Sequence, residues 1–379
     1  MQTERQERRK TRDKQESLGR LDWSAWPAYA DSEDGIRNYW YPVMWSRKLG
    51  RRPKAITLLG ERIMLKREAG TVYALNDRCP HRGVPLSHPM ASQEFSGTWT
   101  CCYHGWTFDL ATGELVAAIT DGPDSPIRGK VAVRCYPVEE RLGLIWVYVG
   151  DRPAPPVEQD IPSELLAEDA LVVGRRTERG GDWRFGAENG FDEGHAKFLH
   201  RNSLWAFKRR MPTWNIHHVE ERPERWITRM NDEVHYETEF PGLGIWPKRR
   251  WWKTPKQRTR RGVSTRLPGV LRVHFERYDH FEWWVPTERG DHIYLQMIVR
   301  PGSRLRRIGF WLYYWVWVRW AFHMMFNGQD TLMVDVMDAP PERLYRPDKS
   351  ILAWRRLVED DPRRKEADEG GVPRVAGSG

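Results

Sequence analysis

The sequence of 379 residues predicts an α+β protein with two domains, a small antiparallel β-domain followed by a larger mixed domain. Short runs rich in Val, Ile, Leu, Thr and Tyr, separated by Gly and Asp, occupy residues 54–148 and indicate the β-domain. A proline-rich stretch at 151–156 is typical of a linker. Beyond residue 170, strand-like runs alternate with helical segments, which favours an α+β arrangement for the second domain.

The expected elements follow in chain order. In the first domain we expect strands at 55–59, 63–66 and 144–149. In the second domain we expect strands at 226–230, 235–240, 271–275, 281–285 and 292–299. We expect a charged N-terminal extension at 1–34 and the first domain at 35–152. The second domain follows at 153–360 and a C-terminal tail at 361–379.

Two short cysteine–histidine pairs predict an iron–sulfur cluster. Cys79-x-His81 and Cys101-x-x-His104 stand nineteen residues apart. Two thiolates and two imidazoles suit a [2Fe–2S] cluster of Rieske type, in which the cysteines hold one iron and the histidines the other. Tetrahedral zinc is the alternative. Zinc fingers, however, usually place cysteine with cysteine and histidine with histidine, so the mixed pairs favour the cluster.

A second metal site is indicated by His195 and His200, which have carboxylates nearby in the sequence. Two histidines and one carboxylate form the facial triad of non-haem Fe(II) oxygenases. Positions five apart on an ideal helix lie about 140° apart around its axis, so these two can converge on one metal only if the helix bends or ends between them. A pair of ordinary surface or core histidines is the alternative.

Residues 189–200 resemble the signature Asn-x-x-Asp-x-x-His-x₄-His of the Rieske oxygenases, and the cysteine–histidine loops resemble those of the same family. The resemblance runs from about residue 35 to residue 358, except at 201–262 and 302–326. Within the family the chain resembles the carbazole dioxygenase type. It implies that the second domain has an antiparallel sheet flanked by helices around the iron, a helix-grip-like arrangement.

The resemblance also implies roles for individual residues. His195 and His200 would be the imidazole ligands of the iron, and Asp330 the carboxylate ligand, with Asp335 and Asp338 as rivals on the same segment. The catalytic residues would be Asn189 and Asp192. In the family, the carboxylate corresponding to Asp192 is hydrogen-bonded to an iron-ligating histidine and to a cluster histidine of the neighbouring subunit, which implies a homotrimer. Asp192 lies three positions before His195, so a continuous helix would place both on one face.

The cofactors and partners follow from the same resemblance. It implies one [2Fe–2S] Rieske cluster, one mononuclear Fe(II), O2 as co-substrate and a hydrophobic (poly)cyclic aromatic substrate such as carbazole, in aromatic hydrocarbon catabolism. The chain has no Gly-x-Gly-x-x-Gly motif in a strand–helix context. We therefore expect a separate ferredoxin and/or NAD(P)H-dependent reductase, with NAD(P)H acting only through the reductase. The alternatives are a Rieske monooxygenase that hydroxylates or dealkylates a steroid, terpenoid or aromatic ether, and an electron carrier without chemistry of its own.

Charge and cysteine content set further limits. The net charge of +9 is partly local, in the basic stretches 248–253 and 256–261, which also contain two tryptophans. Because no nucleic-acid-binding module accompanies them, we predict no nucleic-acid partner. We interpret them as a solvated loop, with a dock for an acidic ferredoxin as the functional alternative and a membrane-surface contact as the third. Four cysteines, two of them cluster ligands, suit a reducing cytoplasm. Residues 1–19 lack the apolar core of a secretory signal and are interpreted as a solvated tail or short exposed helix.

The segment 308–326 is apolar and aromatic over nineteen residues, nearly enough for a helix that spans a bilayer. Arg319 and His323 interrupt it, and six Tyr and Trp are unusual for a lipid core. We therefore predict a helix that is buried on most sides and leads into Asp330. A peripheral membrane contact through its aromatic side chains is the alternative, and a true membrane span is disfavoured.

Overall fold

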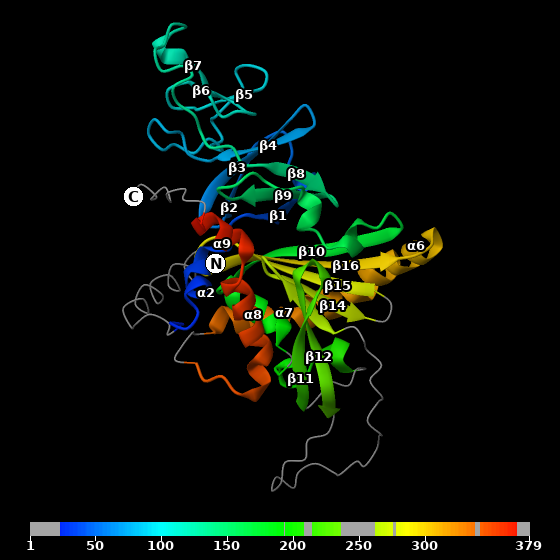
Figure 1. The fold of residues 1–379 in the computed structure, drawn as a ribbon. Coiled ribbons are helices and arrows are strands. Elements are labelled where there is room, and N and C mark those ends of the chain that lie inside the picture. Colours follow the sequence, from blue (N-terminus) through cyan, green and yellow to red (C-terminus); the bar gives the residue numbers. More distant parts are fainter. Residues whose placement is uncertain are drawn as a thin grey trace.

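The computed structural model describes residues 23–192, 194–207, 214–235, 262–275, 278–337 and 342–369. Most of the strand expected at 235–240, both basic stretches and Asp338 lie outside these ranges. Figure 1 shows a small β-rich part at one end of the molecule and a larger sheet with helices at the other.

The first domain is built from antiparallel strands. They are β1 (Tyr39–Trp45), β2 (Lys54–Leu58), β3 (Glu61–Glu68), β4 (Thr71–Asn76), β5 (Thr98–Thr100), β6 (Trp106–Asp109), β7 (Leu115–Ala118), β8 (Val138–Arg141) and β9 (Leu144–Val149). Within the described ranges they form three sheets, with the orders β1-β9-β8, β2-β3-β4 and β5-β6-β7. All six residues of β9 are apolar and buried, so this strand is a centre of the core. The predicted small antiparallel β-domain is confirmed.

The second domain contains one large antiparallel sheet. Its strands are β10 (Ala170–Gly180), β11 (Trp214–Arg222), β12 (Trp226–His235), β13 (Val263–Arg266), β14 (Val270–Phe275), β15 (Tyr278–Pro286) and β16 (Asp291–Pro301). In the part of the chain that the structure describes, their order is β10-β16-β15-β14-β13-β12-β11. β15 and β16 are buried on both faces over most of their length, because helices cover the side opposite the first domain. The predicted α+β fold with an antiparallel sheet flanked by helices is confirmed.

The helices come before, between and after these strands. They are α2 (Pro27–Asp31), α3 (Trp183–Phe191), α4 (Ala196–Leu199), α5 (Leu204–Phe207), α6 (Arg304–Tyr313), the π-helix η8 (Tyr314–Phe326), α7 (Asn327–Val336), α8 (Lys349–Glu359) and α9 (Pro362–Glu369). Single 3₁₀ turns are η2 (Ser32–Asp34), η3 (Ser46–Lys48), η4 (Ile119–Asp121), η5 (Val157–Gln159), η6 (Ser163–Leu166), η7 (Pro223–Arg225) and η9 (Arg346–Asp348).

Helix α3 is the element that positions the second metal site. Its N-cap residue Asp182 accepts a hydrogen bond from the backbone N–H of Arg184, which satisfies one of the free donors of the first turn. Gly186 then lets the helix lie directly on β15, because a Cβ at this position would come within 2.1 Å of the ring of Trp284. α3 also contacts α7 and α8. The sheet therefore sets the position of α3.

Segments at both ends of the described chain are packed into the structure. Trp23 and Tyr29 are buried, and α2, inside our charged N-terminal extension, contacts α8. At the other end, Arg363 of α9 pairs with Asp160 at 2.8 Å. The hydroxyl of Tyr39 donates to the buried Asp361 at 2.9 Å. Buried aromatic residues and ion pairs thus fix parts of the chain whose composition suggests solvated tails.

The segment 308–326 is helical, but the prediction that it is buried on most sides is wrong. It runs from α6 into η8. Tyr314, Val318 and Phe322 are buried, whereas Val316 is 79% exposed and Trp315 is 46% exposed. The reason is that the helix lies against the sheet with one face only, and no described residue covers the opposite face. No helix among the described residues is both long and apolar enough to cross a bilayer.

Arg355 of α8 holds α3 in place, and its removal should destabilise the protein. Its guanidinium is 1% exposed and binds the buried Glu188 of α3 at 2.7 Å and also Glu342. Arg355→Met leaves the Glu188 carboxylate buried without its cation, at a cost of about 3–5 kcal/mol in the free energy of unfolding. Urea unfolding followed by tryptophan fluorescence measures the change. Arg356→Met, on the exposed side of the same helix, is the control, and an equal effect of both substitutions would contradict this role.

Candidate metal centres

Two loops of the first domain carry the predicted cluster ligands. The loop between β4 and β5 holds Cys79 and His81, and the loop between β5 and β6 holds Cys101 and His104. Each loop is a tight turn, because the glycine four residues after each cysteine donates its N–H to that cysteine's carbonyl, at 2.8 and 3.1 Å. These glycines have φ angles of +73° and +66°, which residues with a Cβ rarely adopt.

The four side chains separate into two pairs. Cys79 and Cys101 are 2% and 3% exposed and belong to the same buried cluster of side chains. The rings of His81 and His104 lie further out, with centroids 4.4 Å apart. Among the described residues, these four donor atoms do not converge on a single point as the ligands of one ion would. This separation fits two irons, one with sulfur ligands and one with nitrogen ligands, better than a tetrahedral zinc ion.

The chemistry of the donors also fits a metal cluster. Burial raises the pKa of the Cys79 thiol to about 11. Without a metal this thiol is neutral at physiological pH, whereas coordination to a cation removes its proton. On the outer side, Trp106 stacks on His81 with ring centroids 4.7 Å apart and planes inclined by 12°. This contact restricts the orientation of one imidazole.

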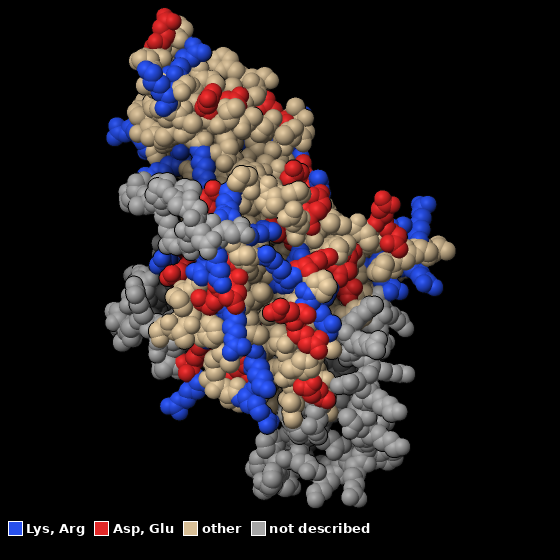
Figure 2. Space-filling view, viewed as in Figure 1, with Lys and Arg blue, Asp and Glu red and all other residues tan. Residues whose placement is uncertain are grey.

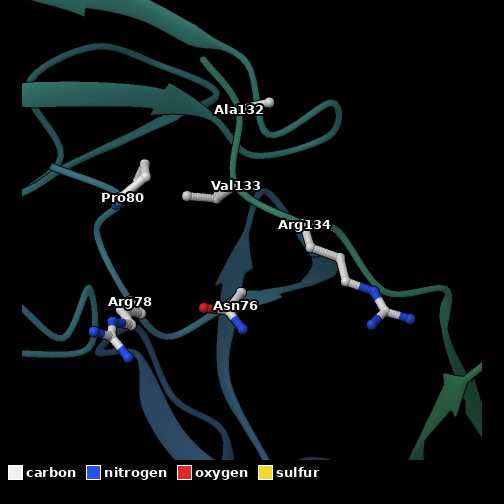
Figure 3. Close-up of a pocket in the computed structure, with 6 residues that line it drawn as sticks. All are labelled: Asn76, Arg78, Pro80, Ala132, Val133 and Arg134. Atoms are coloured by element: carbon white, nitrogen blue, oxygen red, sulfur yellow. The ribbon is translucent and has the colours of Figure 1, made fainter. Parts of the chain in front are cut away.

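A small hollow lies beside the first loop, as Figure 3 shows. It has a volume of about 200 Å³ and is lined by Asn76, Arg78, Pro80, Ala132, Val133 and Arg134. The side chains of Pro80 and Val133 point toward one another, whereas Arg134 points away and pairs with Glu61 at 3.1 Å. The hollow is smaller than the 300–1,000 Å³ typical of ligand pockets. It therefore does not have the dimensions of a site for a polycyclic substrate.

The second site lies where α3 and α4 meet α7. α3 ends at Phe191, and the four-residue helix α4 begins just after His195 and ends just before His200. The two histidines thus flank the single turn of α4, which ends at Leu199. An end of the helix between the two histidines is what we expected from their spacing of five residues. Asp330 lies in the first turn of α7. The three side chains come from two segments of the chain, and the contact between α3 and α7 joins these segments.

Asp330 faces both imidazoles. Its Oδ1 lies 3.4 Å from Nε2 of His195 and 3.2 Å from Nε2 of His200. One donor atom from each residue lies within 4.8 Å of the others, and this is the group of potential metal ligands found among the described residues. His200 is 1% exposed and Asp330 is 7% exposed, whereas the side chain of His195 is 23% exposed, so solvent reaches the site mainly at His195. Asn189 donates to Oδ1 of Asp330 at 3.2 Å.

The electrostatics of this group fit a bound cation. Burial raises the pKa of Asp330, but hydrogen bonds with His195 and His200 outweigh burial and lower it to about 2. Burial lowers the pKa of His195, but hydrogen bonds with Asp192 and Asp330 raise it to about 9. A buried carboxylate needs a positive charge beside it, which either a proton on His195 or a metal ion supplies. Two imidazoles and one carboxylate are suitable ligands for Fe(II).

Asp192 holds His195 in one tautomer. Its Oδ2 lies 3.3 Å from Nδ1 of His195, and its Oδ1 accepts the backbone N–H of Gly194 at 2.8 Å. A carboxylate can only accept, so Nδ1 carries a proton, and Nε2 is the ring nitrogen that faces Asp330 and can bind a metal once its own proton is lost. The continuous helix that we considered for residues 192–195 is absent, because Asp192 has extended backbone angles and caps α3. A turn after the end of the helix makes the contact instead.

Two residues that contact His200 had no assigned role in the sequence analysis. Oε1 of Gln329 lies 3.0 Å from Nδ1 of His200, so Nε2 of this ring also points toward Asp330. Phe326 stacks on the same imidazole, with centroids 3.6 Å apart. Both belong to the segment that leads into Asp330. Gln329 could have been considered from the sequence, because it directly precedes a predicted metal ligand. Asp335, the rival that the structure describes, is not part of the group.

Comparisons with known proteins agree with this geometry. Residues 39–137 match the model of the Rieske [2Fe-2S] domain, and residues 148–364 match the model of homotrimeric ring hydroxylases. The chain belongs to the Rieske ring-hydroxylase family. It is therefore an oxygenase, an oxidoreductase that uses molecular oxygen, and its family implies one Rieske cluster and one mononuclear iron. These predictions from the sequence are confirmed.

Individual relatives extend over nearly the whole chain. The terminal oxygenase component of carbazole 1,9a-dioxygenase from Sphingomonas sp is 32% identical over 375 residues, covering 92% of this chain and 98% of the relative. The same component from Metapseudomonas resinovorans is 31% identical, covering 88% and 93%. A solved carbazole-bound variant of a carbazole 1,9a-dioxygenase oxygenase, in complex with ferredoxin, has a TM-score of 0.78 and 27% identity, covering 94% of this chain and 100% of that one.

Loss of the Gln329 acceptor should weaken metal binding at the second site. Gln329→Leu leaves Nδ1 of His200 without its partner, and we expect ferrous iron to bind about 10–100-fold more weakly to this site. Gln329→Glu keeps an acceptor oxygen and is the matched control. Titration of iron-depleted protein with ferrous iron measures the affinity, while the visible absorbance of the cluster should not change. Equal affinity of the Leu variant and the native protein would show that Gln329 does not orient His200.

Proposed function

We propose that the chain is the terminal oxygenase component of a multicomponent Rieske dioxygenase and inserts dioxygen into a hydrophobic polycyclic aromatic such as carbazole. One observation carries this proposal: a convergent group of His195, His200 and Asp330, the last two of them buried, lies in the same chain as two cysteine–histidine loops. The relatives named above support the substrate class, since their names state carbazole 1,9a-dioxygenation.

We assign the ligand sets accordingly. His195, His200 and Asp330 hold the mononuclear iron. The cluster irons are held by Cys79 and Cys101 on one side and by His81 and His104 on the other. When bound, the cluster supplies single electrons and the mononuclear iron supplies the activation of dioxygen. A facial triad leaves coordination positions free, which an iron used only for electron transfer does not need. The second metal group therefore favours an oxygenase over an electron carrier.

The surroundings of the second site favour an apolar substrate. Phe326 lies against His200, and Phe322 follows it at a centroid distance of 5.5 Å. Leu271 of β14 packs against α3 at Gly190, next to Asn189, where a Cβ would come within 2.7 Å of the Leu271 side chain. Aromatic and aliphatic side chains exclude water and favour an aromatic ring beside the metal. Asn189 and Asp192 have a different function, because they fix the orientation of Asp330 and His195.

The two metal sites of one chain lie in different parts of the molecule. Figure 1 shows the cluster-bearing part at the end remote from α7. We propose a homotrimer, in which Asp192 connects His195 to a cluster histidine of the neighbouring subunit. The family model of homotrimeric ring hydroxylases supports this assembly. We expect His104, which is only partly buried in the single chain, to be that histidine.

Electrons must reach the cluster from outside the chain. We propose a ferredoxin and/or an NAD(P)H-dependent reductase as the donor and a cytoplasmic location, which suits four free cysteines. A solved relative in complex with ferredoxin supports the first partner. We also retain residues 35–152 and 153–360 as the proposed domain boundaries.

Product analysis with labelled dioxygen tests the proposed reaction. We expect the reduced enzyme, supplied with a compatible ferredoxin and reductase, to convert carbazole or a related fused heteroaromatic with two labelled oxygen atoms per product molecule. Mass spectrometry counts the atoms. The Asp330→Ala variant is the control, because it should keep the visible cluster spectrum but form no product. One labelled atom per product would assign the chain to the monooxygenases, and full activity of Asp330→Ala would contradict the proposed iron ligand.

Asp192→Asn tests the proposed electron relay, the path from a cluster histidine of the neighbouring subunit through Asp192 to His195, separately from metal binding. The amide keeps the shape of the side chain but removes the negative charge that holds the proton on Nδ1 of His195. We expect both metal sites to stay loaded, as measured by iron and sulfide analysis, while turnover falls by about 100-fold, the upper end of the loss seen when the hydrogen-bond partner of a metal-ligating histidine is changed. Asp335→Asn, in the same domain but outside the ligand group, is the control. Native turnover in Asp192→Asn would remove the relay from the mechanism.

A further inference from the structure

The outward face of α6 and η8 is an apolar surface, which we call the α6–η8 ridge. Four of its side chains recur at helical spacing and are largely exposed: Leu305 at 82%, Ile308 at 49%, Leu312 at 54% and Val316 at 79%. Aromatic side chains flank them, namely Trp311, Tyr313, Trp315 and Trp320, which are 45–46% exposed. On the face toward the sheet, Tyr314, Val318 and Phe322 are buried. The ridge is therefore additional to the core, and contiguous apolar surface of this kind marks an interaction site.

The charge of this segment has one sign. Between Asp291 and Asp330 the sequence contains five arginines and no acidic residue. Arg304 and Arg306 of α6 are exposed at the start of the ridge, and Arg319 lies over the ring of Trp315 at 5.2 Å. The nearest acidic residues in the neighbouring connection are Glu168 and Asp169, where the carbonyl of Asp169 accepts the N–H of Gly302 at 3.3 Å. Figure 2 shows basic side chains at the projecting end where Figure 1 places α6, with acidic ones next to them.

A groove beside α6 combines both properties. It has a volume of about 300 Å³ and lies between the start of β10 and the helix, where it is lined by Ala170, Leu171, Arg304, Arg307, Ile308 and Trp311. Two guanidinium groups are thus held next to an aliphatic and aromatic floor. This combination suits a ligand that has an anionic head and an apolar chain, because arginine binds phosphate through several N–H groups while the floor covers hydrocarbon.

We propose that the α6–η8 ridge binds the surface of a lipid bilayer that contains anionic phospholipids. The apolar stripe enters the boundary between head groups and acyl chains, Trp and Tyr lie at that boundary, and the arginines of α6 bind phosphates. The excess of arginine favours this occupant, because anionic head groups attract it, whereas a two-fold contact between the ridges of two copies would bring like charges together. The proposed trimer contact through Asp192 involves none of the ridge residues, because Asp192 contacts Gly194 and His195 and lies near Tyr345.

Vesicle binding by the full-length holoenzyme tests the proposal. We expect the enzyme to co-sediment with vesicles of phosphatidylcholine and phosphatidylglycerol, more weakly with phosphatidylcholine alone, and less in high salt. Arg304→Gln combined with Arg306→Gln and Arg307→Gln should lower the partition coefficient by roughly 100-fold, since each arginine near an anionic surface contributes about fivefold. The matched control removes three exposed cations of the first domain through Arg51→Gln, Arg52→Gln and Lys54→Gln. This control should bind like the native enzyme.

A second set of variants separates insertion from charge attraction. Leu305→Ser combined with Leu312→Ser and Val316→Ser changes only well-exposed side chains and should reduce binding at least about tenfold through the loss of buried apolar area. Brominated lipids should quench part of the tryptophan fluorescence in the native enzyme and less in this variant. Turnover of a dissolved substrate without vesicles should be native in every variant, so a failure here is distinct from a failure of the proposed reaction.

Three results would overturn the proposal. The first is that the native holoenzyme binds none of the vesicles. The second is that the arginine variant and its control bind equally well. The third is that the serine variant changes the oligomeric mass in sedimentation equilibrium, which would assign the ridge to a contact between subunits.

Discussion

The burial of Asp330 between two imidazoles is the constraint on which the second domain depends. Its charged partners among the described residues are histidines, at 3.2 and 3.4 Å, and a carboxylate in this position is stable only while a positive charge lies with it. The carboxylate comes from α7 and the imidazoles follow α3, so these helices must keep their relative position. Arg355 and Gly186 secure α3 against α8 and β15, and thereby preserve the site.

The end of α3 converts this constraint into a geometry for metal binding. Asp192 caps the helix in an extended conformation, and the chain turns before the short α4. His195 and His200 then flank α4, and each imidazole has an oxygen acceptor at Nδ1, from Asp192 and Gln329 respectively. Both rings therefore present Nε2 to the same point. A longer helix would have directed the two rings about 140° apart.

The sequence predicted best what local motifs encode. Cys79, His81, Cys101 and His104 lie in two short loops, so their spacing alone indicates the cluster, and the strand pattern indicates the β-domain. Gln329 and Phe326 could not be assigned, because their role depends on contact with His200, more than 120 residues away in the chain. Val316 was predicted to be buried because its segment is apolar, yet it is exposed. Tertiary packing decides which face of a helix the sheet covers, and composition does not show this.

The ridge and the second metal site are two faces of one continuous helical segment. η8 runs directly into α7, so the chain that exposes Trp311 and Val316 outward places Phe322 and Phe326 inward. Phe326 contacts His200, and Asp330 follows four residues later. An apolar ring compound, the substrate of such an oxygenase, concentrates in lipid rather than in water. An aromatic segment that contacts a bilayer on one side and the metal site on the other would place the enzyme where such a substrate is most abundant.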